Sequence, residues 1–207
     1  MDVLTGLLIA IGGISFLAWR DPGLMQKLIF SPYLVKERGE YYRFLTSGFI
    51  HADYIHLGFN LFVLWNFGEA MQYVFQNEFG DAWQIHFLAL FLLGVIVSEI
   101  PTYLRYRTLP HYRSLGASGG VASIVFAFIF IFPLEKLYFF LIPMPAIVYG
   151  VGYLFYCTYQ DKRQADHINH SAHLWGSVFG VVYLIALKPV LVLYFIEQLA
   201  NWRNYFL

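Results

Sequence analysis

The stretch from Ala172 to Leu187 reads AHLWGSVFGVVYLIAL, and it decides the fold class. It contains no Asp, Glu, Lys or Arg, and an apolar run approaching about 20 residues is typical of a membrane-spanning helix. Gly176 and Gly180 have the G-x-x-x-G spacing that lets two membrane helices approach closely. His173 precedes Gly176 by three positions and so shares its helical face. The helix that packs on this face is therefore expected to meet an imidazole.

The whole chain has the composition of a membrane protein. Of its 207 residues, 59% are hydrophobic and 13% are charged, and the mean hydropathy is +0.58. A soluble domain normally carries roughly a quarter charged residues, so most of this surface is expected to face lipid. The formal net charge of zero argues against a nucleic-acid partner. Cys157 is the single cysteine, which excludes an internal disulfide.

Apolar stretches long enough to cross a bilayer occur six times in the chain. The predicted spans cover approximately 3–19, 57–75, 82–104, 115–134, 137–159 and 172–187. The sequence therefore predicts an all-α membrane protein, a bundle of six transmembrane helices in a single domain over residues 1–207. The N-terminus has no basic region or cleavage site, so we expect it to begin the first span rather than a signal peptide.

Two connecting segments need separate treatment. Residues 20–56 mix apolar with basic side chains and are expected to lie at the membrane interface. Residues 189–207 are too interrupted for a seventh span, and we expect them to extend the sixth helix or to lie on the surface.

Polar residues inside the predicted spans need a reason, because they are costly in lipid. Asn60 follows His56 by one helical turn, so both lie on one face of the second span. The fourth span begins with SLGASGG, residues 114–120, where small neighbours leave the hydroxyl and N–H of Ser118 accessible. A helix N-terminus at this place suits a developing oxyanion. Each motif alone is also compatible with simple helix packing.

Residues 116–120 also fit the pattern G-x-S-x-G of the α/β-hydrolases. That pattern needs a strand before the serine and a helix after it. Here the serine opens a hydrophobic span after a loop, so we set this interpretation aside.

Taken together, the motifs are far more specific than their parts. They read HLGFN at 56–60, GASG at 116–119 and AHLWGSVFG at 172–180. In order and spacing they match the H-x-x-x-N, G-x-S-G and A-H-x-x-G-x-x-x-G motifs of the rhomboid family. From about residue 42 to residue 180, the chain resembles this family of intramembrane serine proteases.

The resemblance implies a serine–histidine dyad without a carboxylate. Ser118 would attack the scissile carbonyl and His173 would act as the base. The oxyanion would be held by the Ser118 N–H together with the side chains of Asn60 and His56. The family also implies that no metal or cofactor takes part. The small residues expected to pack helices together are Gly116, Gly119, Gly176 and Gly180.

The resemblance further implies that the substrates are transmembrane proteins, reached through the lipid bilayer. Phe59 and the aromatic stretch 149–159 are candidates for the substrate gate. Water is expected to reach the site through a polar mouth made by His51, His56, Asn169 and His170. The compact chain suggests a bacterial inner membrane protein. The oligomeric state and the physiological substrate are not predicted.

The chain departs from the family in three respects. Tyr42 precedes Arg43 where many members have tryptophan, and Gln72 replaces a glutamate that commonly pairs with this arginine, so Glu69 is expected to substitute. Ala122 replaces an aromatic residue that stacks on the histidine. Lys and Arg concentrate in the connections after the first, third and fifth spans, which the positive-inside rule assigns to the cytoplasm. Family topology places the active site on the outer face, and we follow the family.

Three rival functions remain open at this stage. The chain could be a non-catalytic rhomboid-like protein that binds membrane helices. His167, His170 and His173 are spaced by three and could hold zinc on one helical face. A small transporter is the least favoured rival, because no internal repeat is visible.

Overall fold

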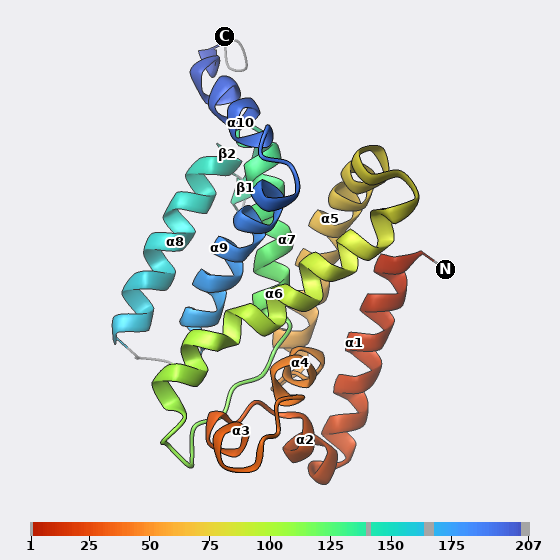
Figure 1. The fold of residues 1–207 in the computed structure, drawn as a ribbon, viewed down its shortest axis with the longest axis vertical. Helices are drawn as coiled ribbons and strands as arrows, with labels where there is room; N and C mark the ends of the chain where they lie inside the picture. Colours follow the sequence, from red (N-terminus) through yellow and green to blue (C-terminus); the bar gives the residue numbers. More distant parts are fainter. Residues whose placement is uncertain (1, 140–141, 164–167, 204–207) are drawn as a thin grey trace.

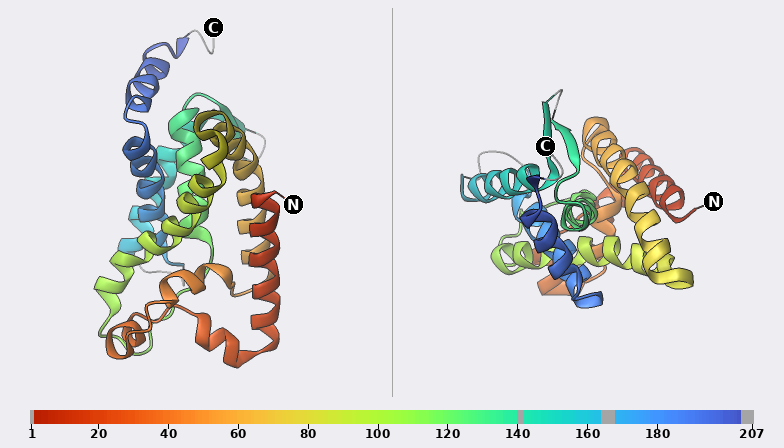
Figure 2. Two further views of the ribbon diagram at one scale, coloured as in Figure 1. Left: turned by 45° about the vertical axis from the view of Figure 1, so that its right-hand side comes forward. Right: turned by 90° about the horizontal axis from the view of Figure 1, so that it is seen from above.

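The structure is a computed structural model that describes residues 2–139, 142–163 and 168–203. Its centre is helix α7 (Ser118–Ile131), which is seen end-on in the view from above (Figures 1 and 2). Helices α5 (Tyr54–Phe79), α6 (Trp83–Tyr106), α8 (Ala146–Arg163) and α9 (His170–Leu187) pack around it. Helix α1 (Val3–Arg20) lies outside, against α5. The predicted six-helix membrane bundle is confirmed.

Short elements close the two ends of the bundle (Figure 1). One end carries α2 (Pro22–Leu28), α3 (Pro32–Arg38), α4 (Arg43–Thr46) and the 3-10 turn η1 (Ser47–Phe49). The other end carries the turn η2 (Gly80–Ala82), strands β1 (Lys136–Phe139) and β2 (Ile142–Pro145), and helix α10 (Leu191–Ala200). Helices α2 and α3 each begin with a proline after a capping side chain, Asp21 and Ser31, which is a favoured way to start a helix.

The predicted fifth span, 137–159, is wrong at its start. Strands β1 and β2 pair antiparallel, with Lys136 opposite Pro145, and the helix begins only at Ala146 and continues to Arg163. Pro143 and Pro145 lack the N–H groups that a helix would need here. The expected extension of the sixth helix is also wrong, because α10 is a separate helix after the break at Lys188.

The helix lengths indicate how the protein sits in a bilayer. Within the described part of the chain, three stretches are long and apolar enough to cross a membrane: Val3–Arg20, Tyr54–Tyr106 (which holds α5 and α6) and His170–Leu187. Helix α7 has only 14 residues, or about 21 Å, less than the roughly 30 Å of hydrocarbon. Every residue of α7 after Ser118 is buried. It is surrounded by protein, so its first residue lies partway through the bundle.

The outer faces of the surrounding helices are apolar. Large hydrophobic side chains on them are exposed, among them Ile9, Leu17, Phe62, Ile85, Phe155 and Val182. Such a surface is stable in lipid and not in water. The chain is therefore an integral membrane protein.

Arg43 does not meet the partner expected for it. Its guanidinium is buried and pairs with Glu40 at 2.6 Å. Glu69 instead accepts a hydrogen bond from a tryptophan on its own helix, and Gln72 accepts one from the N–H of Leu4 in α1. The expected substitution by Glu69 is wrong, because that side chain lies on the exposed face of α5.

Helices α7 and α9 touch backbone to backbone. A Cβ added at Gly176 would overlap the carbonyl group of Gly119, and a Cβ at Gly180 would overlap that of Ser123. The Ser123 hydroxyl lies 2.9 Å from the Gly119 oxygen and 3.0 Å from the Gly176 oxygen, and donates toward both. Ser123 of α7 therefore faces the second glycine, Gly180.

We expect Gly180→Ala to lower the free energy of unfolding by about 1–3 kcal/mol, because the new methyl group must push apart two backbones. Denaturant or thermal unfolding in detergent measures the effect. Gly152→Ala in α8 is the matched control, since a Cβ there meets nothing within 4 Å, and its change should stay below about 1 kcal/mol. Equal destabilisation by both variants would contradict the packing argument.

Candidate active site

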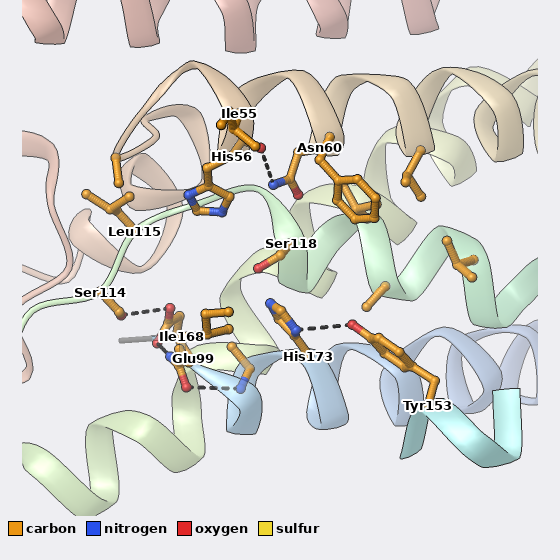
Figure 3. Close-up of a pocket in the computed structure, with 18 of the residues that line it drawn as sticks. Ile55, His56, Asn60, Glu99, Ser114, Leu115, Ser118, Tyr153, Ile168 and His173 are labelled. Carbon is orange, nitrogen blue, oxygen red and sulfur yellow. Dashed lines mark hydrogen bonds between the residues drawn. The ribbon is translucent and has the colours of Figure 1, made fainter. Parts of the chain in front are cut away.

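A cavity of about 680 Å³ lies among α5, α6, α7, α8 and α9 (Figure 3). Its walls are mainly apolar, with a small number of polar groups, as is usual for sites that take organic ligands. The polar and titratable side chains that line it are Asp53, His56, Asn60, Glu99, Arg113, Ser114, Ser118, Tyr149, Tyr153, Asn169 and His173.

The structure brings Ser118 and His173 together in this cavity. Ser118 is the first residue of α7, and His173 lies in the first turn of α9. In Figure 3 the Ser118 side chain points toward His173, whose Nε2 faces it. Both side chains are half-buried. A serine hydroxyl beside an imidazole nitrogen is the arrangement from which a nucleophile can be activated.

Tyr153 from α8 holds the other side of the imidazole. Its hydroxyl lies 3.1 Å from Nδ1 of His173, and the two rings are nearly parallel, with 12° between their planes. If Nδ1 carries the proton and donates it to the tyrosine oxygen, Nε2 keeps a lone pair for Ser118. From the sequence, the stretch 149–159 was a candidate for the gate. The sequence also has Ala122 at the position where many family members have an aromatic residue that stacks on the histidine. An aromatic partner for the histidine comes from α8 instead.

His56 and Asn60 lie on the α5 side of the cavity. Asn60 Nδ2 donates to the carbonyl oxygen of His56 at 2.9 Å, and the same nitrogen has a second N–H to offer. The His56 ring packs on Gly116, where an added Cβ would lie 2.7 Å from Cε1 of the imidazole. Gly116 has φ +125°, which favours glycine, and it lies in the loop before α7. Its expected role in helix packing is therefore wrong: it admits the imidazole of His56.

The residues that precede Ser118, here called the nucleophile loop (114–117), are fixed by backbone hydrogen bonds. Ser114 and Phe30 exchange N–H···O bonds of 3.2 and 3.0 Å, as in an antiparallel bridge. The N–H of Gly116 donates to the carbonyl oxygen of Ser47 at 2.9 Å. The interfacial segment between α1 and α5 thus positions the start of α7.

His51 completes this support. Its Nε2 accepts from the N–H of Ala117 at 3.2 Å, so the proton must be on Nδ1. Nδ1 then donates to the Ser15 hydroxyl at 3.0 Å, and Ser15 donates to the carbonyl oxygen of Phe49. Burial, and secondly the nearby His56, lower the pKa of His51 to about 3. The expected place of His51 in a polar mouth is wrong, because the side chain is fully buried.

Glu99 is a site residue that the sequence reasoning missed. Its two oxygens accept from the Ser114 hydroxyl at 3.0 Å and from Asn169 Nδ2 at 3.1 Å. Asn169 also caps α9, since its side chain accepts from the N–H of Ala172. Glu99 thereby ties the nucleophile loop to the start of the helix that carries the histidine. The available signal was an acidic residue inside an apolar span.

The histidines proposed as zinc ligands are only partly described. His167 lies outside the described residues. His170 is buried, which overturns its expected place in the mouth, and its ring stands edge-on to that of His173. Among the residues that the structure describes, the metal-binding atoms of Cys157, His170 and His173 lie within 4.8 Å of one another.

Comparisons with known proteins agree with the motifs. Residues 38–190 match the family model described as Rhomboid domain. The chain is 28% identical over 188 residues to presenilin-associated rhomboid-like protein A, mitochondrial, of Danio rerio, covering 87% of this chain and 46% of that protein. It is 26% identical over 201 residues to RHOMBOID-like protein 12, mitochondrial, of Arabidopsis thaliana, covering 87% and 57%.

A third relative is rhomboid protein 1, mitochondrial, of Saccharomyces cerevisiae, with 28% identity over 146 residues that cover 67% of this chain and 40% of that protein. The chain therefore spans about half the length of the curated relatives it matches.

The buried His51 gives the stability a pH dependence. Its pKa is lowered on folding from the ordinary value of 6.5 to about 3, so the unfolded chain binds a proton that the folded chain does not. The stabilisation is complete above about pH 6.5 and falls by up to about 1.4 kcal/mol per pH unit below it.

His51→Gln keeps a hydrogen-bond acceptor but cannot titrate. Between pH 7 and pH 5, we expect the free energy of unfolding of the wild type to fall by about 2 kcal/mol more than that of this variant. Denaturant unfolding of both proteins at both pH values measures this difference. Parallel pH curves for the two proteins would contradict the assignment.

Proposed function

Because the chain belongs to the rhomboid family, we propose that it is an intramembrane serine endopeptidase that cleaves transmembrane-helix substrates with a Ser118–His173 dyad. The observation that carries the proposal is the orientation of Ser118 toward Nε2 of His173 inside a cavity that also contains Asn60 and His56. Fold and family alone would not be enough, since one fold can host several functions.

In the proposed reaction, Ser118 Oγ attacks the carbonyl carbon of the scissile peptide bond while His173 Nε2 takes the hydroxyl proton. The imidazolium then gives that proton to the leaving amine, and the C–N bond breaks. Water attacks the resulting ester, again with His173 as base, and releases the acid and the free serine. Tyr153 accepts from Nδ1–H and so keeps the imidazole oriented throughout the cycle.

The negative oxygen that forms on attack requires nearby donors. Ser118 contributes its own N–H, which belongs to the first turn of α7 and has no acceptor within the helix. Asn60 and His56 contribute side-chain donors from the opposite wall. Since these groups lie in a mostly apolar cavity, each is worth more than it would be in water.

The proposed substrate is a membrane helix that approaches from the lipid. Phe59 on α5 is 67% exposed and also lines the cavity. Tyr149 and Tyr153 on α8 line it from the other helix. We assign Phe59 to the gate between these helices, because its ring can swing without disturbing the core. A substrate helix must unwind locally to present its peptide bond, since helical carbonyl groups are shielded.

The comparisons bear on the membrane in which the protein resides. It is an integral membrane protein, and the three relatives named above are mitochondrial by name. A bacterial inner membrane remains a prediction that none of these relatives supports, and the sidedness of the active site likewise stays a prediction. The connections rich in Lys and Arg after α1 and α6 lie at the end of the bundle that carries α2, α3 and α4 (Figure 1). Arg113, in the second of these connections, lines the cavity.

The alternative is a rhomboid-like protein that binds membrane helices without cutting them. Such a protein would need the cavity but not the dyad. The presence of both Ser118 and His173, with a tyrosine that orients the imidazole, favours the enzyme.

Ser118→Ala should abolish cleavage of a transmembrane substrate, with a loss of at least about a thousandfold, because the nucleophile is removed. The assay is incubation of the purified protein with a reporter helix in detergent or liposomes. Thr158→Ala is the control, because it removes an exposed hydroxyl that bonds to the carbonyl oxygen of Leu154 on its own helix, α8, and does not line the cavity, so it should retain most activity. Cleavage that persists in Ser118→Ala would exclude the dyad.

Asn60→Ala should lower kcat by roughly 100-fold with little change in KM, since an oxyanion donor acts in the transition state. Asn66→Ala is its control, because Asn66 makes the same bond to the carbonyl oxygen four residues earlier but lies exposed on the outside of α5. Steady-state measurements of kcat and KM for the wild type and the two variants test this prediction. Similar losses in both variants would point to a helix-stability effect and against the oxyanion role.

A further inference from the structure

Next to Ser118 lies a cluster of three reactive side chains, of which the proposed mechanism uses only His173. Cys157 comes from α8, and His170 and His173 come from the first turn of α9. Cys157 and His170 are buried, and His173 is half-buried. One ligand atom from each of the three lies within 4.8 Å of the other two.

The chemistry of this cluster fits zinc. A thiolate and two imidazoles are among the ligands that Zn²⁺ prefers, at about 2.3 Å for sulfur and about 2.0 Å for nitrogen. At these bond lengths the ligand atoms of a tetrahedral zinc ion are separated by about 3.5 Å. Side-chain rotations that shorten the present separations of up to 4.8 Å would therefore let the three residues bind one ion. His170 and His173 are spaced i, i+3 on one face of α9, which keeps both imidazoles on the side that faces Cys157.

A fourth ligand is available from the cavity. His173 lines that cavity, so a water molecule in it can complete the tetrahedron. Three protein ligands and one exchangeable position are a common arrangement for zinc. Binding converts the Cys157 thiol to a thiolate and releases its proton to solvent, so the affinity must rise with pH.

We propose that Cys157, His170 and His173 form a binding site for Zn²⁺ that reversibly switches off the serine–histidine dyad. The metal site itself rests on the geometry, whereas its inhibitory effect rests on the proposed function. A metal ion on Nε2 of His173 occupies the lone pair that the serine proton needs. A metal ion on Nδ1 displaces Tyr153 and leaves the proton of a neutral imidazole on Nε2. In either case the base is lost.

The metal site can be tested without any protease assay. The full chain is purified in detergent, freed of metal with a chelator and titrated with Co²⁺, which replaces zinc and absorbs light. Cys157 is the only cysteine in the chain, so a thiolate-to-cobalt charge-transfer band can come from no other residue. We expect the band to saturate at one Co²⁺ per chain, to disappear on addition of Zn²⁺, and to be missing in Cys157→Ser.

The inhibitory effect is tested on the same samples with the reporter helix. Saturating Zn²⁺ should reduce cleavage by the wild type at least about tenfold, and excess chelator should restore it. Cys157→Ser is the matched control, since it should cleave at close to the wild-type rate without metal and need much more Zn²⁺ for the same inhibition. His170→Gln should likewise weaken the cobalt band.

The outcomes separate the two claims. Absence of a saturable charge-transfer band in the wild type, or an equal band in Cys157→Ser, overturns the metal site. A saturated band with undiminished cleavage overturns the inhibitory role. A chain that binds Co²⁺ through Cys157 but cleaves no substrate when metal-free supports the metal site and counts against the proposed protease function instead.

Discussion

The whole site depends on the direct contact between the backbones of α7 and α9. Two glycines of α9 lie against main-chain carbonyl groups of α7, where no Cβ could fit. Membrane helices have no hydrophobic effect to drive them together, so close packing and interhelical hydrogen bonds must supply the attraction. Because Ser118 and His173 lie one turn or less from this contact, the interaction that stabilises the bundle also brings these two side chains together.

This contact alone would leave both ends of the site free to move. The nucleophile loop is held by backbone bonds to the interfacial segment and by His51, and α9 is held at its cap by Asn169. Glu99 joins the two supports, with one carboxylate oxygen for each. A buried acid is costly unless its oxygens are paired. Here the partners of the two oxygens belong to the loop before Ser118 and to the start of the helix that carries His173.

The sequence was sufficient to predict the membrane helices and the residues that lie at helical spacing on one face of them. Ser118 and His173 could be found because each lies in a local pattern of small residues within an apolar span. The sequence could not predict the hydrogen bonds of Tyr153, Glu99 and His51, because their partners are 20, 70 and 66 residues away and no local pattern marks the pairing. The hairpin before α8 was missed because its apolar residues hid the effect of its two prolines.

The long-range bonds around the nucleophile loop also bear on biosynthesis. Ala117 is fixed by a histidine 66 residues earlier, and His173 is contributed by a helix that begins only at His170. No shorter, partly inserted chain contains all of these groups. Ser118 and His173 therefore cannot meet before α9 has docked, so the proposed protease stays inert while the chain enters the bilayer and does not cleave neighbouring membrane proteins during that time.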